Sequence, residues 1–221
     1  MPEAGPPALP AAAPEGAATL PDATGPDKAA RPPLVLASGS PRRRDLLARI
    51  GVVPARILPP EIDERPRPQE LPRQLAGRLS QEKARAVMAG EPAALVLAAD
   101  TVVGVGRRIL PKAETEAQAR DCLSLLSGRR HRVYTGVALG LPDGRLLTRV
   151  VESVVTFQRL TAAQVEAYIA SGEWRGKAGG YTIQESAEAF VRFLSGSHSN
   201  VVGLPLHETA QLLRGIGWLR P

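Results

Sequence analysis

Six consecutive small or aliphatic residues, Ala94–Ala99, run directly into Asp100 and Thr101. An unbroken apolar run of this length fits a strand that is buried on both faces, as in the parallel part of an α/β sheet. A carboxylate at the end of such a strand is expensive to bury without a partner. A cation, a metal ion or a catalytic task should therefore accompany Asp100.

The rest of the chain alternates between strand-like and helix-like segments. Strands are expected at 34–38, 55–58 and 190–194, a short hairpin at 102–110 and a long hairpin from 132–141 and 145–157. Helices are expected after Pro41, at 71–89 and 114–126, from Thr161 onward, and at 203–215. This order predicts an α/β fold built around a mixed sheet.

The first 33 residues differ in composition from everything that follows. They are mostly Pro, Ala and Gly, contain no aromatic residue and show no periodicity. Such a segment cannot bury enough apolar surface to offset the entropy of ordering, so residues 1–33 are predicted to be a disordered tail and 34–221 a single domain. Prolines interrupt each apolar run of the tail, which argues against a signal peptide.

Composition narrows the function classes. One cysteine, Cys122, excludes an internal disulfide, and three scattered histidines make a zinc site implausible. No run approaches the roughly 20 apolar residues that cross a bilayer, so a cytoplasmic protein without membrane contact is expected. The net charge of +6 invites a nucleic-acid interpretation, but aromatic residues make up only 4% of the chain. A single-strand binder needs stacking aromatics along a basic groove, so a small polyanionic ligand is the preferred explanation.

The segment Ser38-Gly39-Ser40-Pro41 leads from a predicted strand into a helix that starts with three arginines, Arg42–Arg44. Unpaired N–H groups at a helix N-terminus bind anions, and arginine grips phosphate bidentately. Three cations at that end oppose the helix dipole unless an anion joins them. The alternative is a plain N-cap at Ser40 with solvated arginines.

Two further groups of charged residues have weaker signals. The acidic stretch Glu61–Glu64 could hold a divalent cation through oxygen ligands, although acid clusters are usually solvated loops. Only four lysines occur in an arginine-rich chain, and Lys83, Lys112 and Lys177 lie near the other motifs. Such lysines indicate a need for a compact point charge. The alternative is that each one is an ordinary solvent-exposed surface charge.

Near the C-terminus, the glycine-rich stretch Lys177–Gln184 is predicted to be a loop that enters a strand. Its glycines permit close approach of a ligand, and Gln184 offers both a donor and an acceptor to the edge of a base. His131 lies between arginines and is expected to be exposed, and Cys122 is expected in the core.

Taken together, these segments resemble the Maf family of nucleotide pyrophosphatases. The motifs occur in the family's order: LASGSPRRRDLL (36–47), EIDE (61–64), LSQEKARAV (79–87), AADTVV (98–103), Lys112, LSGRRHRVYTGVAL (126–139), KAGGYTIQE (177–185) and NVVGLPLHET (200–209). The resemblance implies a Maf/ITPase-like fold, an elongated mixed β-sheet flanked by helices with a central cleft. It also implies hydrolysis of a nucleoside triphosphate to the monophosphate and pyrophosphate, often by a homodimer.

The resemblance assigns roles to individual positions. It implies that Asp100 is the general base or a metal-held carboxylate, that Asp63 is the second acid, and that both hold Mg²⁺ or Mn²⁺. The residues implied to bind phosphate are Ser38, Arg43, Lys83 and Lys112. The residues implied to set substrate preference are Arg42, Thr101 and Gln184.

These last three residues resemble the family's dTTP/UTP group rather than its 7-methyl-GTP group, which remains an alternative. A nucleotide-binding regulator of cell division or septum formation, without turnover, is the other alternative. The chain departs from the family pattern at Glu185, where glycine is usual, and around Lys112, which lies between proline and alanine. Asp63 is also one methylene shorter than the family's usual glutamate.

Overall fold

The computed structural model describes residues 31–220, and its contacts form one compact unit that begins at Pro32. Residues 1–33 are predicted to be disordered. All but the last three of them lie outside the described residues, so this stays a prediction. Within the described range no helix is long and apolar enough to cross a membrane.

A mixed sheet of seven strands organises residues 31–220, and its order is β2-β1-β3-β6-β7-β9, with β4 paired to β3. The strands are β1 (Leu34–Leu36), β2 (Arg56–Ile57), β3 (Leu95–Val105), β4 (Arg108–Leu110), β6 (Arg130–Gly140), β7 (Leu146–Phe157) and β9 (Val191–Ser195). Strand β1 is parallel to β2 and β3, and the other pairs are antiparallel. The mixed α/β fold predicted from the sequence is confirmed.

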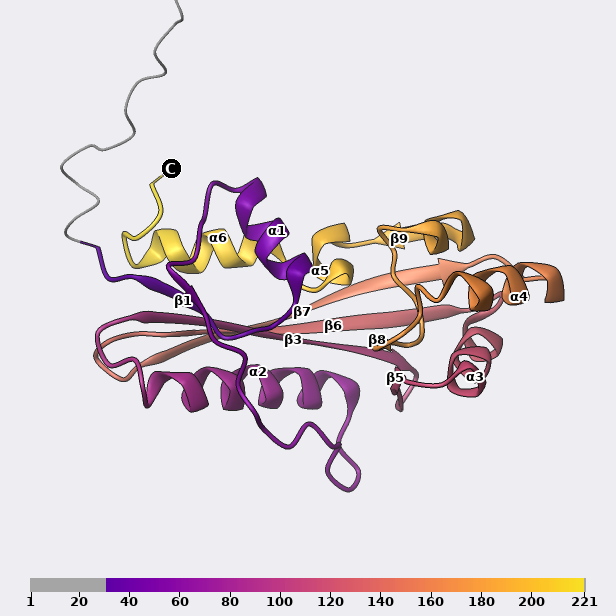
Figure 1. Ribbon diagram of the computed structural model, residues 1–221, viewed down its shortest axis with the longest axis horizontal. Coiled ribbons are helices and arrows are strands. Elements are labelled where there is room, and N and C mark those ends of the chain that lie inside the picture. Colours follow the sequence, from indigo (N-terminus) through magenta and orange to yellow (C-terminus); the bar gives the residue numbers. More distant parts are fainter. Residues whose placement is uncertain (1–30, 221) are drawn as a thin grey trace, which may run out of the picture. The chain divides into compact units, whose positions relative to one another are not determined.

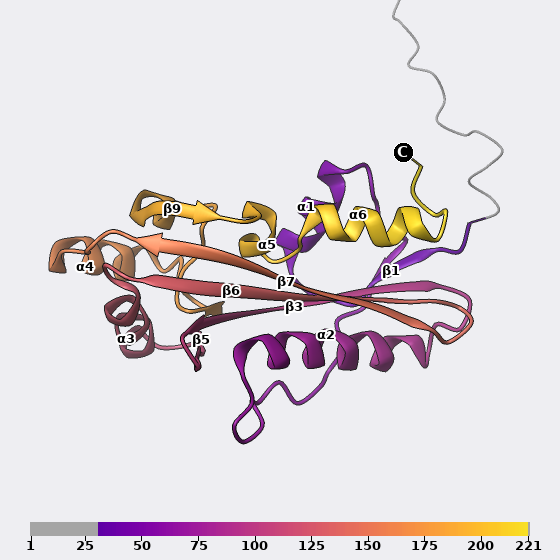
Figure 2. The same cartoon turned by 180° about the vertical axis from the view of Figure 1, so that it is seen from behind.

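Helices cover both faces of the sheet (Figure 1). Helix α2 (Pro72–Met88) packs along β3, β6 and β7 on one face, and α1 (Pro41–Arg49), α5 (His198–Val202) and α6 (Leu206–Gly215) lie over the other. The reverse view shows the same layers, with α3 (Glu116–Leu126) and α4 (Ala162–Ser171) together at one end of the sheet (Figure 2).

Alternation along β3 explains why both faces are covered. Leu95 and Leu97 are buried in the cluster that contains α1 and α6 side chains, whereas Val96 and Ala98 are buried in the cluster on the α2 side. Successive side chains of a strand point to opposite faces, so an unbroken apolar run needs a layer on each. Gly136 lets α2 approach β6 closely, because a Cβ at that position would lie 2.1 Å from the Ala76 carbonyl oxygen.

Strand β3 does not end where its apolar run ends. It continues through Asp100 to Val105 and returns as β4, so the predicted strand end at Asp100 is wrong. The parallel neighbour β1 stops instead, since its last paired residue, Leu36, lies opposite Leu97. Between that point and Val103, where β4 begins to pair, one side of β3 has no neighbouring strand, and the crevice expected past the end of a parallel strand forms there.

The C-terminal third also differs from the predicted elements. The helix expected at 203–215 is α6, which begins only at Leu206 after Pro205 at its N-cap. The short helix α5 before it was not expected, and Gly203, with a left-handed φ of 132°, ends it. The stretch 177–184 does not lead directly into a strand as expected; instead its first two residues form β8 (Lys177–Ala178), which pairs with β5 (Lys112–Ala113). The chain then turns into the 3₁₀ helix η2 (Ser186–Phe190).

Candidate active site

A cavity of about 370 Å³ opens in the crevice beyond the end of β1. Its walls come from the β1–α1 turn, the loop before α2, α2 itself, β3, the segment 176–184 and the end of α5. Eight of the nine site residues predicted from the sequence line it: Ser38, Arg42, Arg43, Lys83, Asp100, Thr101, Lys112 and Gln184. The ninth, Asp63, is not among the described residues that line it.

Arg43 ties the first turn of α1 to the floor of the cavity. Its guanidinium donates to the Ser38 hydroxyl at 2.8 Å, to the Gly203 carbonyl at 2.9 Å and to the Thr101 hydroxyl at 3.4 Å. Burial lowers the pKa of Arg43, and the nearby Asp100 carboxylate acts in the opposite direction. Arginine stays protonated at neutral pH even when it is buried, so a fixed positive charge lies in the cavity wall.

The other features of that turn are mixed. Ser40 takes the N-cap position and Pro41 the first helical position, as predicted, but the Ser40 side chain makes no capping hydrogen bond. Arg42 is half-buried in the cavity wall, whereas Arg44 is exposed and pairs with its neighbour Asp45. Two of the three consecutive arginines therefore serve the cavity.

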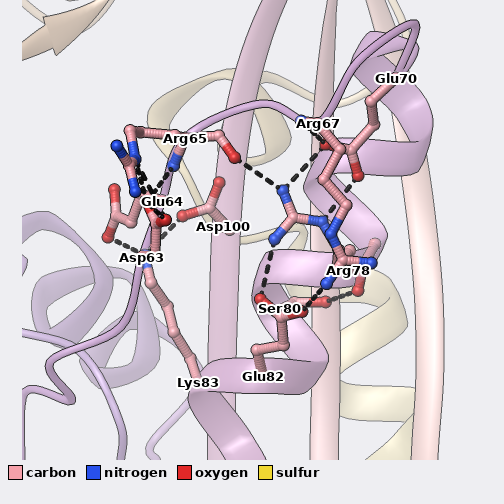
Figure 3. A network of polar contacts seen from close by, with 11 residues as sticks. Asp63, Glu64, Arg65, Arg67, Glu70, Arg78, Ser80, Glu82, Lys83 and Asp100 are labelled. Atoms are coloured by element: carbon pink, nitrogen blue, oxygen red, sulfur yellow. Dashed lines mark hydrogen bonds and ion pairs between the residues drawn. The ribbon is translucent and has the colours of Figure 1, made fainter.

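Lys83 is the centre of a buried cluster of charges (Figure 3). Its ammonium contacts Asp100 Oδ1 and Glu64 Oε1, each at 2.6 Å, and Lys112 contacts the other oxygen of Glu64. The Lys83 and Asp100 side chains are only 8% and 6% exposed. An unpaired buried charge is costly, so a partner for Asp100 was expected from the sequence. That partner is Lys83, on α2, the helix that packs against β3.

Glu64, rather than Asp63, is the second carboxylate of the cluster. Asp63 is 60% exposed and forms a bidentate pair with Arg65, whose hydrogen bonds lower the pKa of that carboxyl to about 2. Exposure alternates along this segment, with Glu61 and Asp63 exposed and Ile62 and Glu64 half-buried. Ile62 packs against the core cluster on α2, and Glu64 shares its inward side while Asp63 faces solvent. The apolar residue at 62 is the signal that could have identified Glu64.

The lysines also set the charge of Glu64. Burial alone would raise its pKa, but hydrogen bonds from Lys112 and Lys83 outweigh that effect and hold the pKa at about 2. Glu64 is therefore fully ionised at neutral pH, and two lysines compensate two carboxylates in the cluster.

The far end of the cavity is formed by the segment that follows β8. Gln184 and Arg42 line it together with Thr182 and Ile183. The Tyr168 hydroxyl accepts a hydrogen bond from the Thr182 backbone N–H at 3.2 Å, which fixes the chain two residues before Gln184. This end combines the Gln184 amide with the charged Arg42, and such groups can orient a planar ligand.

Comparison with known proteins identifies the family. The family model described as "Maf-like protein" matches residues 33–216, which is most of the chain. The chain belongs to the Maf family.

Several curated proteins are close relatives of this chain in sequence. A "dTTP/UTP pyrophosphatase" from Novosphingobium aromaticivorans is 61% identical over 86% of this chain and 94% of its own length. Proteins of the same description from Caulobacter vibrioides and Maricaulis maris are 61% and 62% identical, covering 86% and 85% of this chain and 98% and 90% of their own lengths.

The resemblance to the Maf family implies a divalent metal, and the acidic residues of the cavity fit one. Glu64 and Asp100 direct carboxylate oxygens at a single point, where Lys83 lies. Mg²⁺ commonly uses one or two carboxylates and takes its other ligands from substrate phosphates and water. Among residues 31–220 no group of three or more Asp, Glu, His or Cys side chains converges, so the donor set suits an ion that arrives with a phosphate ligand.

Besides Asp63, two features of the site were missed or misplaced by the sequence prediction. Lys177 also lines the cavity, although from the sequence it was only placed near the motifs, without a role. His131 was expected to be exposed but is buried at 1%, because on β6 it alternates with exposed Arg130 and Arg132. Its Nε2 lies 2.8 Å from the Tyr181 hydroxyl behind the cavity wall.

Glu185, the departure from the Maf pattern, lies outside the described lining of the cavity. Its side chain is exposed, at the position before η2. It acts on the site at longer range, since its charge raises the pKa of Arg42 against the larger lowering caused by burial.

Proposed function

We propose that this Maf-family protein hydrolyses nucleoside triphosphates, dTTP and UTP in particular, to the monophosphate and pyrophosphate. The observation that carries the proposal is the set of cations, Arg43, Lys83 and Lys112, in one cavity with the buried carboxylate Asp100. The relatives called dTTP/UTP pyrophosphatase, about 60% identical over most of both chains, support the choice of substrate.

The cations account for the triphosphate. A cavity of about 370 Å³ is within the usual size range for a small-molecule site. Arg43 has a planar fork that suits phosphate oxygens, and Lys112, also in the cavity lining, is half-exposed beside Glu64. We place the phosphate chain against these two cations, where charge that develops on the departing pyrophosphate is stabilised.

A divalent ion, Mg²⁺ or Mn²⁺, completes the proposal. When bound it would neutralise charge on the phosphate oxygens and act as a Lewis acid. Asp100 and Glu64 would hold it, and Glu64 takes the second acidic role that the sequence analysis gave to Asp63. Oxygen-only donors favour these ions over softer metals.

Asp100 has the position that a base for the attacking water requires. It is buried at the floor of the cavity, and Lys83 keeps one of its oxygens oriented at 2.6 Å. The carboxylate would orient a water molecule for in-line attack at the α-phosphorus and accept its proton. Thr101, next along β3, shares a hydrogen bond with Arg43 and would link the phosphate wall to the base-binding end.

Base selection falls to the opposite end. Gln184 can pair with the edge of a pyrimidine through its amide, and Arg42 is half-buried beside it. A site built to hydrogen-bond one edge rejects analogues that leave its buried polar groups unpaired. We place the activity in the cytoplasm, where the nucleotide pool is available.

The test is a nucleotide panel in H₂¹⁸O with Mg²⁺. We expect pyrophosphate release from dTTP and UTP, slower release from dCTP and 7-methyl-GTP, and ¹⁸O in the monophosphate. Release of orthophosphate, or tight binding of nucleotides without turnover, would contradict the proposal, and the second result would favour the regulator without turnover.

A further inference from the structure

Arg78, on α2 five residues before Lys83, is the centre of a second network of charges (Figure 3). Its guanidinium grips Glu70 with two hydrogen bonds, of 2.7 and 2.8 Å, and binds Glu82 one helical turn along at 2.9 Å. The Arg78 and Glu70 side chains are only 13% and 8% exposed. A network this buried is more costly to break than a surface pair.

This network holds the loop that delivers Glu64 to the cavity. Arg78 donates a further hydrogen bond, of 3.0 Å, to the carbonyl oxygen of Arg65, the residue directly after Glu64. Glu82 also binds the Arg67 side chain at 3.0 Å, and Glu70 accepts the Arg67 backbone N–H at 2.9 Å. Three residues before α2, namely Arg65, Arg67 and Glu70, are therefore bound to side chains of α2 by charged hydrogen bonds.

Packing alone gives the loop little support. A second, mostly apolar cavity of about 390 Å³ lies against it, and Glu64, Arg65 and Pro66 form part of its wall. Residues 65–69 are all exposed, and Gln69 has a left-handed φ of 61°, a conformation that costs energy for any residue with a side chain. Ile62 is the apolar anchor before Glu64, and the Arg78 network is the anchor after it.

We propose that Arg78 is a positioning residue that acts through Glu64. It is not among the described residues that line either cavity, so it has no direct contact with a ligand there. By fixing the carbonyl of Arg65 and the side chain of Glu70, it keeps the Glu64 carboxylate between Lys83 and Lys112. The inference rests on the proposed function only for its effect on turnover.

The test is a double-mutant cycle on dTTP hydrolysis. Arg78→Met is expected to lower kcat about 10-fold or more, in the range measured for residues that orient functional ligands, with KM changed less than about 3-fold. In the Glu64→Gln background the same substitution should cost less than about 2-fold, because the group on which it acts is gone. Equal losses in both backgrounds would overturn the inference.

The chain offers a matched control in Arg120 on α3. It also grips one glutamate with two hydrogen bonds, Glu166 at 3.0 and 2.8 Å, and binds a second one helical turn away, Glu116 at 3.1 Å. Arg120→Met removes a network with the same bonding pattern, although Arg120 is 40% exposed; Arg120 is not among the described residues that line the cavity, and the substitution should leave kcat within about 2-fold of the parent. A loss equal to that of Arg78→Met would show a general effect of broken ion pairs.

Amide hydrogen exchange separates this inference from the proposed function. Arg78→Met should speed exchange in the peptide 61–71 by about 10-fold and leave the peptide 98–105 unchanged, whether or not any nucleotide is hydrolysed. If the wild type hydrolyses no nucleotide, the proposed function fails while this readout still tests the loop; unchanged exchange in 61–71 overturns the inference. Should Arg78→Met not fold, Arg78→Lys, which keeps the charge but not the fork, takes its place in every arm.

Discussion

Replacing Lys83 by Met should destabilise the fold far more than replacing any exposed lysine. The substitution fills nearly the same volume but removes the ammonium that contacts Asp100 and Glu64 at 2.6 Å. Glu64 is 35% exposed and keeps Lys112, so most of the cost comes from Asp100, which is 6% exposed. Removing one partner of a buried pair costs about 3–5 kcal/mol. The attraction of Arg43 for Asp100 places our expectation near the lower limit.

Urea denaturation, followed by tryptophan fluorescence in metal-free buffer, measures this loss. The matched control is Lys112→Met, which removes an ammonium that is 49% exposed and should cost about 0–1 kcal/mol. Adding Asp100→Asn to Lys83→Met should restore most of the lost stability, because the stranded charge is removed. Equal losses for the two lysine variants, or no recovery in the double variant, would refute the assignment of Lys83 as the partner of Asp100.

Three further outcomes follow from the site. Glu64→Gln should lower kcat for dTTP by about 100-fold or more, whereas Asp63→Asn should stay within about 2-fold, and the reverse order would restore the role first given to Asp63. Gln184→Ala should lower the preference for dTTP over dCTP, in kcat/KM, by about 10-fold; an equal loss for both nucleotides would remove Gln184 as a base reader. Burial lowers the pKa of His131 from 6.5 to about 4, so the folded state binds its proton less well than the unfolded state. Its contribution to stability is therefore present above pH 6.5 and is lost as the pH falls toward 4. Between pH 7 and 4.5 this should account for about 2 kcal/mol of the unfolding free energy, and the pH dependence of His131→Phe should be flatter by that amount.

The sequence could predict which residues meet in the cavity because local chemistry already required partners for them. A carboxylate after six apolar residues needs a counter-charge, and Asp100 has one in Lys83. Three arginines at a helix start oppose the dipole, and two of them, Arg42 and Arg43, line the cavity. Each of these residues violates a local rule, and such violations gather at functional sites.

Other features of the site depend on contacts between segments that are separate in the sequence, which the local sequence pattern does not predict. The crevice beside Asp100 exists because β1 stops opposite Leu97, and the length of one strand is not encoded in its neighbour. Glu64 and Asp63 are chemically similar, and only the packing of Ile62 decides which one faces inward. The Arg78 network includes direct bonds between residues up to 15 positions apart, through a loop with no periodic signal.

The most direct test of the central claim is pyrophosphate release by Asp100→Asn under saturating dTTP and Mg²⁺. The account predicts a turnover at least about 100-fold below wild type, with unchanged secondary structure and retained binding of dTTP, because the proton acceptor and one proposed metal ligand are removed while the phosphate-binding cations remain. Turnover within about 3-fold of wild type would contradict the account, since the buried carboxylate would then have no part in the reaction.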